Sequence, residues 1–368
     1  MHLADVTPSI FAGLGLIDPH GRNEFEPSPH GRECLLLVDG LGASIIREFA
    51  DHIPIFSSLT NMKTVETSFP STTATSLTTL MTGEMPGAHG MLGYTVRVPR
   101  SGGRILNALK WDERVDPMIW QPIPTLFERA VRQGIGVSHV ASKRYEESGF
   151  TRAAFRGAEY RGANVLDEMI SEVQKSFSRT PAFTYVYINE LDVAGHSDGV
   201  GSEKWLGALT YVNTVITTLL EKLPRGVRLW ITADHGMVNV DEKIVIGEDN
   251  SLLEGISLIA GEPRARHLYL SDEYDGDGVN EIALMWRQTL GEKIKVFTRR
   301  EALSVGLFGP VVSLDSKERM GDLVVIARDG LVLIDPARKV PESAMVGHHG
   351  ALTDDERFVP LAMREIGS

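Results

Sequence analysis

Acidic residues follow three apolar runs of this sequence, at the point where each run ends. The run CLLLVDG leads to Asp39 and the run FTYVYINELD leads to Asp192. The run VRLWITADHG carries an Asp-His pair, Asp234 and His235. In an open parallel sheet the carboxyl ends of the strands share one edge, where ligands bind. One such aspartate most often caps the next helix, but three of them indicate a shared site.

Two histidine motifs can complete this site. In ELDVAGHSDG, His196 stands four residues after Asp192, so both side chains project from one face of a helical turn. In GHHG, His348 and His349 lie between glycines that allow a tight turn. Each motif is weak alone, because the D-x-x-x-H spacing arises by chance in helices and histidine pairs are often only exposed.

Together these residues form a mixed nitrogen and oxygen ligand set, which suits zinc first and manganese second. The set comprises Asp39, Asp192, His196, Asp234, His235 and one of the GHHG histidines. Six ligands exceed one tetrahedral zinc but supply two zinc ions, each with an open position. Two metals about 4 Å apart are the usual clamp for in-line displacement at phosphorus.

Hydroxyls for this chemistry are concentrated in FPSTTATSLTTLMTG, residues 69–83. A hydroxyl bound to a metal loses its proton near neutral pH and needs no separate base. A helix that begins here also directs backbone N–H groups and the positive end of its dipole toward a phosphate. Composition alone does not distinguish Thr72 from Thr73 as the nucleophile.

The elements that position these residues follow from the pattern of the chain. Short apolar runs, Gly or Asp turns and helical periodicity alternate, which predicts an α/β fold with a mainly parallel central sheet. The clearest predicted strands are 34–40, 136–142, 183–192 and 227–236. The predicted helices are 73–81, 124–133, 164–176 and 203–223.

The pattern changes after about residue 250. HLYLSD, a helical EIALMWRQTLG, IKVFTR and VVIARDGLVLID follow one another, and Asp329-Gly330 is predicted to form a hairpin turn. The chain then returns to the GHHG motif. We therefore expect a smaller α+β insertion at 251–340, within a catalytic core made of 1–250 and 341–368.

Composition narrows the class of protein. The chain has 368 residues, 42% of them hydrophobic and 23% charged, which fits a globular protein of one large domain or two. The net charge of -12, with no basic run, argues against binding of a nucleic-acid polymer. A small anionic substrate still fits if bound cations dominate the local field.

Cys34, the only cysteine, excludes an intramolecular disulfide and a cysteine metal site. The N-terminus lacks a basic region followed by an apolar one, and no apolar run reaches about 18 residues. We therefore expect a cytoplasmic protein without a membrane partner.

Five motifs, in order, resemble the alkaline phosphatase superfamily and, within it, the type I phosphodiesterase and nucleotide pyrophosphatase family. They are VDG at 38–40, FPSTTATSLTTLMTGEMPGAHG at 69–90, ELDVAGH at 190–196, ADHGM at 233–237 and HHG at 348–350. The resemblance implies the superfamily's fold, in which helices cover both faces of a mainly parallel sheet. It also implies a two-metal hydrolase of a small phosphate ester or nucleotide, acting through a covalent phospho- or nucleotidyl-threonine.

The resemblance implies a role for each candidate residue. In the family, the nucleophilic threonine lies ten residues before the glycine of the T-G that precedes P-x-x-H-G, and counting back from Gly83 selects Thr73. One zinc is then expected on Asp192, His196 and His349. The other is expected on Asp39, Thr73, Asp234 and His235.

Tyr94 departs from the family pattern. The family's phosphodiesterases carry an Asn there that hydrogen-bonds the phosphoryl oxygen, so the Tyr94 phenol or an adjacent backbone amide becomes the expected donor. The residue after the nucleophile is Ala74, whereas phosphatases that prefer monoesters typically carry an arginine there. A guanidinium usually recognises the phosphate dianion, so its absence favours a diester or pyrophosphate substrate.

Several alternatives remain open. Lys143, Arg144 or Arg152 can reach the site from a loop, which leaves a phosphomonoesterase as the main alternative. The DG-x-G at Asp39 is shared with cofactor-independent phosphoglycerate mutases, whereas the C/S-x-P-x-R motif of sulfatases is missing. A metal-binding protein without catalytic activity is the alternative from another functional class. Structural zinc sites are normally closed and rich in Cys or His, however, whereas the ligands here include three carboxylates.

Overall fold

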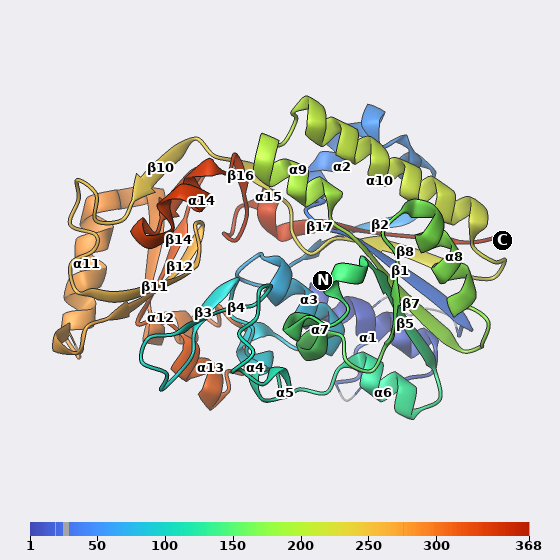
Figure 1. Cartoon of the computed structure of the whole chain (residues 1–368), viewed down its shortest axis with the longest axis horizontal. Coiled ribbons are helices and arrows are strands. Elements are labelled where there is room, and N and C mark those ends of the chain that lie inside the picture. Colours follow the sequence, from blue (N-terminus) through green and yellow to red (C-terminus); the bar gives the residue numbers. More distant parts are fainter. Residues whose placement is uncertain (19, 25–28, 275, 368) are drawn as a thin grey trace.

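A computed structural model describes residues 1–18, 20–24, 29–274 and 276–367 (Figure 1). Within these residues, a seven-stranded sheet has the order β2-β17-β8-β1-β7-β5-β6. In that order the strands are Thr60–Glu66, Phe358–Glu365, Arg228–Thr232, Arg32–Val38, Ala182–Ile188, Gly136–Ala141 and Glu159–Gly162. The pairs from β8 to β6 are parallel, and β17 runs antiparallel to both of its neighbours. The predicted mainly parallel sheet is therefore confirmed.

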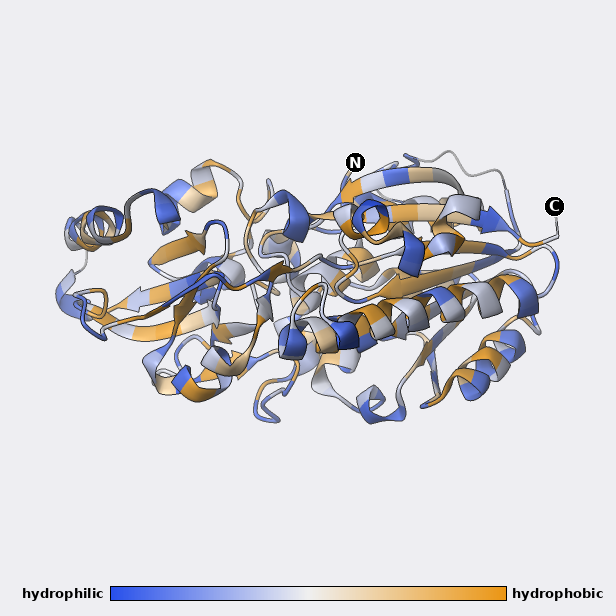
Figure 2. Cartoon of the chain, turned by 90° about the horizontal axis from the view of Figure 1, so that it is seen from above, coloured by the Kyte–Doolittle hydropathy of each residue, from blue (hydrophilic) through white to orange (hydrophobic). Residues whose placement is uncertain are grey.

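Helices cover both faces of this sheet, as predicted (Figure 1). One face carries α2 (Ala43–Glu48), α8 (Leu166–Ser176), α9 (Glu190–Asp198) and α10 (Glu203–Lys222). The other carries α1 (Leu3–Gly13), α3 (Thr73–Thr82), α6 (Leu126–Arg132) and α7 (Gly149–Ala154). Because both faces are covered, β1 is buried from Cys34 to Val38 and its sequence is a continuous apolar run. The hydropathy colouring of Figure 2 shows this apolar layer along the strands.

A second, antiparallel sheet stands beside the first and has the order β11-β12-β14-β13 (Figure 1). In that order its strands are Ile256–Glu262, Ala265–Leu270, Leu323–Ala327 and Ile294–Thr298. Helix α11 (Gly278–Leu290) packs its buried Trp286 into a hydrophobic cluster that is separate from the main core. This is the predicted α+β part of the chain.

The predicted boundaries at 250 and 341 stay a prediction. Strand β10 (Glu242–Val245) precedes the first boundary, yet it pairs in parallel with β15 (Leu331–Ile334), which lies inside the predicted insertion. Main-chain hydrogen bonds therefore join a strand before residue 250 to a strand inside the predicted insertion.

The hairpin predicted at Asp329-Gly330 is wrong. The chain does turn there, and the Leu331 amide donates to the Arg328 carbonyl at 3.1 Å. However, β14 lies between β12 and β13, and β15 pairs with β10 instead. Because both edges of β14 are already occupied, β15 cannot add to it as a hairpin partner.

All four predicted strands extend too far at their carboxyl ends, the one at 136–142 by a single residue. The strands predicted at 34–40, 183–192 and 227–236 end at Val38, Ile188 and Thr232. The acidic residues beyond these ends belong to loops or, for Asp192, to helix α9.

Further short α-helices and strands connect these elements. The helices are α4 (Pro86–His89), α5 (Pro117–Trp120), α12 (Arg299–Ser304), α13 (Leu314–Arg319), α14 (Lys339–Ala344) and α15 (Asp354–Arg357). The strands are β3 (Thr95–Arg97), β4 (Ile105–Asn107), β9 (Val238–Asn239) and β16 (Gly347–His348). No helix in the described residues combines the length and the apolar character needed to cross a membrane.

Candidate active site

The three predicted acidic motifs meet because their strands are neighbours. In the sheet, β1 lies between β8 and β7, with Val38 opposite Ile188 and Leu37 opposite Thr232. All three strands run in the same direction, so their carboxyl ends share one edge of the sheet. Asp39 follows β1, the Asp-His pair follows β8, and α9 begins shortly after β7.

Asp39, Asp234 and His235 form the first cluster, with one ligand atom from each within 4.8 Å of the others. The Nε2 atom of His235 lies 3.2 Å from Asp39 Oδ1 and 3.5 Å from Asp234 Oδ2. Its Nδ1 atom lies 3.0 Å from the Gly236 carbonyl oxygen. A carbonyl can only accept, so Nδ1 carries the hydrogen and the Nε2 lone pair is left for a metal.

Asp192, His196 and His349 form the second cluster, again within 4.8 Å. The Nε2 atoms of His196 and His349 lie 3.5 Å and 3.8 Å from Asp192 Oδ1. The Nδ1 atoms of both histidines face carbonyl oxygens at 2.8 Å, those of Gly347 and Ser71. The same tautomer argument therefore applies to both rings.

The two clusters are adjacent, since the rings of His235 and His349 stack with centroids 3.5 Å apart. The structure thus brings all six predicted protein ligands together in the predicted groups of three. His348 belongs to neither cluster among the described residues, and it pairs with Val238 in the short ladder of β16 and β9.

The positive charge within the two clusters is too small to balance their buried carboxylates. Asp39 Oδ1, Asp192 Oδ1 and Asp234 Oδ2 are buried without a hydrogen-bond partner in the described part of the chain, and they are the oxygens that face the histidine Nε2 atoms. Burial raises the pKa of Asp192 to about 6. Burial, together with nearby Asp39, raises the pKa of Asp234 well above its ordinary value. Burial alone would lower the pKa of His235, but the charges of Asp234 and Asp39 outweigh it and raise the pKa to about 10. Divalent cations would satisfy these oxygens, so the residues fit a metal site.

Thr73 is the first residue of α3 and faces the first cluster. Its Oγ1 lies 3.2 Å from His235 Nε2, and the side chain is buried. Other hydroxyls of this helix are used internally, since Thr78 and Thr82 each donate to a carbonyl one turn earlier at 2.7 Å. The helix ends at Thr82, and Gly83, whose φ is 71°, caps it in the left-handed conformation that suits glycine.

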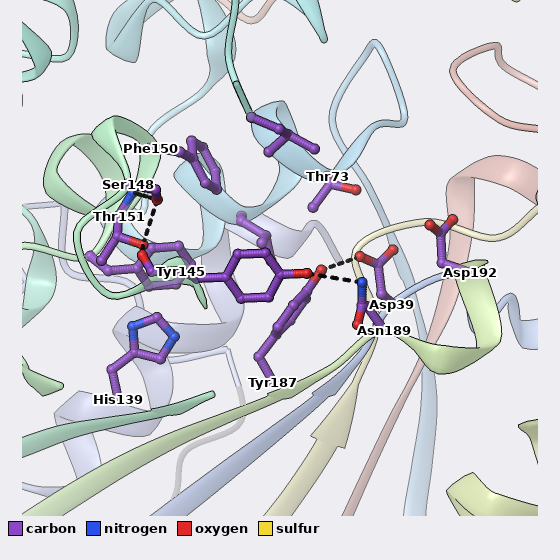
Figure 3. Close-up of a pocket in the computed structure, with 13 residues that line it drawn as sticks. Asp39, Thr73, His139, Tyr145, Ser148, Phe150, Thr151, Tyr187, Asn189 and Asp192 are labelled. Atoms are coloured by element: carbon purple, nitrogen blue, oxygen red, sulfur yellow. Dashed lines mark hydrogen bonds between the residues drawn. The ribbon is translucent and has the colours of Figure 1, made fainter. Parts of the chain in front are cut away.

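Two cavities flank Thr73. The first, which we call the aromatic cavity, reaches Thr73, Asp39 and Asp192 at one end (Figure 3). Its remaining walls are mainly apolar and aromatic: Leu77, Leu109, His139, Tyr145, Ser148, Phe150, Thr151, Phe155, Tyr187 and Asn189. At the polar end the Tyr187 hydroxyl donates to Asp39, as Figure 3 shows.

The second, which we call the insertion-side cavity, lies next to the second cluster. It is lined by Thr72, Thr73, Tyr94, Leu109, Asp192, His196, Glu262, Pro263, Arg338, Pro341, Glu342, Met345, His348 and His349. Tyr94 therefore lines the same cavity as the second cluster, and its contact with a phosphate stays a prediction.

Glu262, at the end of β11, is a site residue that sequence reasoning missed. It is 4% exposed, and its Oε2 accepts the Tyr94 backbone amide at 3.1 Å. That amide is therefore already engaged, which leaves the phenol as the polar group that Tyr94 can offer to a ligand. Glu262 Oε1 has no partner among the described residues, and burial raises the pKa of this carboxyl to about 8. Nothing in the local sequence GEPRAR signals such a position.

The cations proposed from sequence lie outside both cavity linings in the described chain. Lys143 pairs with Glu168 at 3.2 Å, and the Arg144 guanidinium stacks over Tyr145, 4.6 Å from the ring centroid. Arg152 donates to the backbone carbonyl of residue 147 at 3.1 Å. Among the described residues, the arginine that lines the insertion-side cavity is Arg338, which the sequence did not single out.

A model of the type I phosphodiesterase / nucleotide pyrophosphatase family matches residues 34–352. The chain belongs to this family. It is 25% identical over 229 residues to mouse ectonucleotide pyrophosphatase/phosphodiesterase family member 1, and 25% identical over 228 residues to the human protein. Each match covers 58% of this chain and 24% of the relative, so the chain matches only about a quarter of the length of these relatives.

Solved structures of the family share the fold. Murine ectonucleotide pyrophosphatase/phosphodiesterase 5 matches with a TM-score of 0.71 at 16% identity, over 90% of this chain and 87% of that chain. The inactive form of the same murine protein in complex with AMP matches equally well, at 15% identity. The human counterpart has a TM-score of 0.70. The family predicted from five short motifs is thereby confirmed, together with its fold.

Proposed function

We propose that this chain is a phosphoric ester hydrolase that cleaves phosphodiester or pyrophosphate bonds through a covalent intermediate on Thr73. The observation that carries the proposal is the position of Thr73 Oγ1, at the N-terminus of a helix and 3.2 Å from His235 in the first cluster. A nucleophilic hydroxyl placed beside two groups of three candidate ligands supports phosphoryl transfer.

The proposed cofactor is a pair of divalent metal ions, with zinc favoured over manganese because the ligands combine imidazole and carboxylate. Asp39, Asp234, His235 and the Thr73 hydroxyl would hold one ion. Asp192, His196 and His349 would hold the other. When bound, the ions lower the pKa of a coordinated hydroxyl or water and neutralise charge that develops on phosphorus-bound oxygens.

The protein's own residues then define the path of the reaction. The Thr73 oxygen, having lost its proton, attacks phosphorus in line, and the bond from phosphorus to the leaving oxygen breaks on the opposite side. The N-terminus of α3 favours the phosphoryl group because it concentrates positive potential there. Water next attacks the phosphorus of the phospho- or nucleotidyl-threonine, the bond from phosphorus to the Thr73 oxygen breaks, and that oxygen regains the proton that the attacking water gives up.

A nucleotide is the proposed substrate class. The aromatic cavity begins at Thr73 and is lined by Tyr145, Phe150, Phe155 and Tyr187, which suit a planar organic group. The residue next to Thr73 is Ala74, so no guanidinium adjoins the nucleophile to meet a terminal dianion. The AMP complex of the murine relative supports the same substrate class.

The test compares three substrates with zinc-loaded protein: a bis-aryl phosphate, the nitrophenyl ester of thymidine monophosphate, and nitrophenyl phosphate. We expect the two diesters to be cleaved at least ~10-fold faster, in kcat/KM, than the monoester. Preference for the monoester would instead identify a phosphomonoesterase. No cleavage of any substrate at full metal occupancy would identify a metal-binding protein without turnover. The cytoplasmic location stays a prediction.

A further inference from the structure

Arg338 is a cationic residue of the insertion-side cavity and has no role in the reaction steps proposed above. It ends the short helical turn Pro336–Arg338 that follows β15. Its guanidinium carbon lies 5.9 Å from the centroid of the Tyr94 ring. The side chain is 37% exposed, so a bound molecule can reach it.

The positive charge of Arg338 is only partly balanced. Its Nε lies 3.3 Å from Glu342 Oε1 but forms no hydrogen bond within the described chain. The other oxygen of Glu342 accepts from Arg266 and from the Asp335 amide. Arg266 is almost fully buried and needs that carboxylate as its counter-charge. One carboxylate therefore serves two guanidinium groups, and the excess positive charge lies at the cavity wall.

The other acidic groups of the cavity do not remove this excess. Asp192 faces the histidines of the second cluster. Burial favours the neutral form of Glu262, and its Oε2 is taken up by the Tyr94 amide. In the described residues, Glu342 is the single ion-pair partner of Arg338.

The insertion-side cavity lies where the leaving group of the substrate is expected. Thr73 contacts His235 of the first cluster, and Asp39 of that cluster lines the aromatic cavity. His196 and His349 of the second cluster line the insertion-side cavity. In-line attack by Thr73 places the leaving oxygen opposite the nucleophile. Thr73 lines both cavities, so with the planar group of the nucleotide in the aromatic cavity, the leaving group is assigned to the insertion-side cavity, which Arg338 also lines.

We infer that Arg338 binds a phosphate carried by the leaving group, and so makes the enzyme prefer pyrophosphate bonds to esters of uncharged alcohols. This inference rests on the proposed function and names the leaving group that the same site selects. A guanidinium recognises phosphate through paired N–H donors. An ester whose leaving group carries no phosphate has nothing to place against Arg338.

The test uses two substrates that transfer the same group to Thr73. Thymidine triphosphate releases pyrophosphate, and the nitrophenyl ester of thymidine monophosphate releases nitrophenol. In zinc-loaded Arg338→Ala we expect kcat/KM for the triphosphate to fall about 10-fold, since a partly exposed charged hydrogen bond lies at the low end of such contributions. The value for the ester should stay within about two-fold, which also shows that the variant is folded.

Two further variants sharpen the result. Arg338→Lys keeps the charge without the planar fork and should lose less than Arg338→Ala. Arg144→Ala removes an arginine that also stacks on a tyrosine, but outside both cavity linings, and should leave the ratio of the two substrates unchanged. In the Thr73→Ala background, which removes the nucleophile, the Kd of the triphosphate should rise by a similar factor when Arg338 is replaced.

Failure of the inference differs from failure of the proposed function. If wild-type protein cleaves the ester and Arg338→Ala leaves the substrate ratio unchanged, or lowers both values equally, Arg338 does not select the leaving group. If wild-type protein cleaves neither substrate at full metal occupancy, the proposed function is wrong and the inference falls with it.

Discussion

Replacing Thr73 or its neighbour Thr72 by alanine separates the nucleophile from the helix cap. The two side chains are adjacent, of one type and both buried, yet they occupy different places. The Thr73 hydroxyl meets His235 in the first cluster, whereas Thr72 is the N-cap of α3 and its side chain makes no capping hydrogen bond. Thr73→Ala should therefore remove the reaction path, and Thr72→Ala should remove little more than packing.

The expected magnitudes follow from these contacts. Loss of a covalent nucleophile should lower kcat/KM by ~10³ or more, equivalent to at least about 4 kcal/mol of transition-state stabilisation. A lost side-chain cap costs about 0.5–2 kcal/mol, but Thr72 makes no such bond, so the loss of a buried methyl group at about 1 kcal/mol dominates. With an unfolding entropy near 2.1 cal/mol/K per residue, 368 residues convert that into a Tm decrease of about 1–2 °C.

The assay is nitrophenol release from the thymidine monophosphate ester at saturating zinc, with the zinc content of each variant measured in parallel. Thr73→Ala should lack turnover but still bind zinc, because the three protein ligands of each cluster remain. Acid-quenched wild-type protein should carry the nucleotidyl group on the peptide that contains Thr73. The reasoning is refuted if Thr72→Ala loses as much activity as Thr73→Ala, or if Thr73→Ala keeps more than about a tenth of wild-type activity.

Three other predictions concern metal, stability and pH. Asp192→Asn should reduce bound zinc from two ions per chain to one, measured by elemental analysis, because it removes the carboxylate of the second cluster only; unchanged stoichiometry would contradict that ligand set. The fully buried Arg264 guanidinium donates to both Glu356 oxygens at 2.8 Å. Glu356→Gln leaves that guanidinium without its counter-charge, so it should lower the free energy of unfolding by about 3–5 kcal/mol and Tm by about 4–6 °C. A Tm shift below about 1 °C in thermal denaturation would refute this. In metal-free protein the Glu262 pKa of about 8 lies above its ordinary value of 4.5, so the folded state binds this proton more tightly than the unfolded state. The free energy of unfolding should therefore fall as pH rises from about 4.5 to 8, by at most about 5 kcal/mol. Urea denaturation across this range should show a shallower fall for Glu262→Gln, and parallel curves for the two proteins would exclude the raised pKa.

The local sequence was enough to predict those site residues that directly follow the carboxyl end of a buried strand. Buried parallel strands read as continuous apolar runs, so the residue that follows such a run must lie at the ligand-binding edge of the sheet. This predicted the positions of Asp39 and Asp234 without any knowledge of contacts. It also explains why the predicted strands ran too long, since periodicity does not mark where a strand gives way to its loop.

Tertiary structure decided what no local pattern encodes. Residue types alone left open which GHHG histidine is a ligand, and only the family resemblance implied His349. The structure supplies the physical reason, because the Ser71 carbonyl, 278 residues away, accepts from Nδ1 of His349 and directs its Nε2 into the second cluster. The second sheet provides another case, because β14 is enclosed on both edges by strands distant in sequence, and the expected hairpin is excluded for that reason.

The sequence by itself determined the family, the sheet and the residue types of two three-ligand groups, because these depend on short motifs and on burial patterns along the chain. Only the tertiary structure placed Glu262 and Arg338 in a cavity that Thr73 also lines, since both come from segments whose folding back toward the sheet is set by long-range packing. A buried carboxyl and a shared ion pair acquire their charge state from surroundings assembled across the whole chain. That is the physical reason why the ligands were visible in the sequence while the residues that shape the substrate cavity were not.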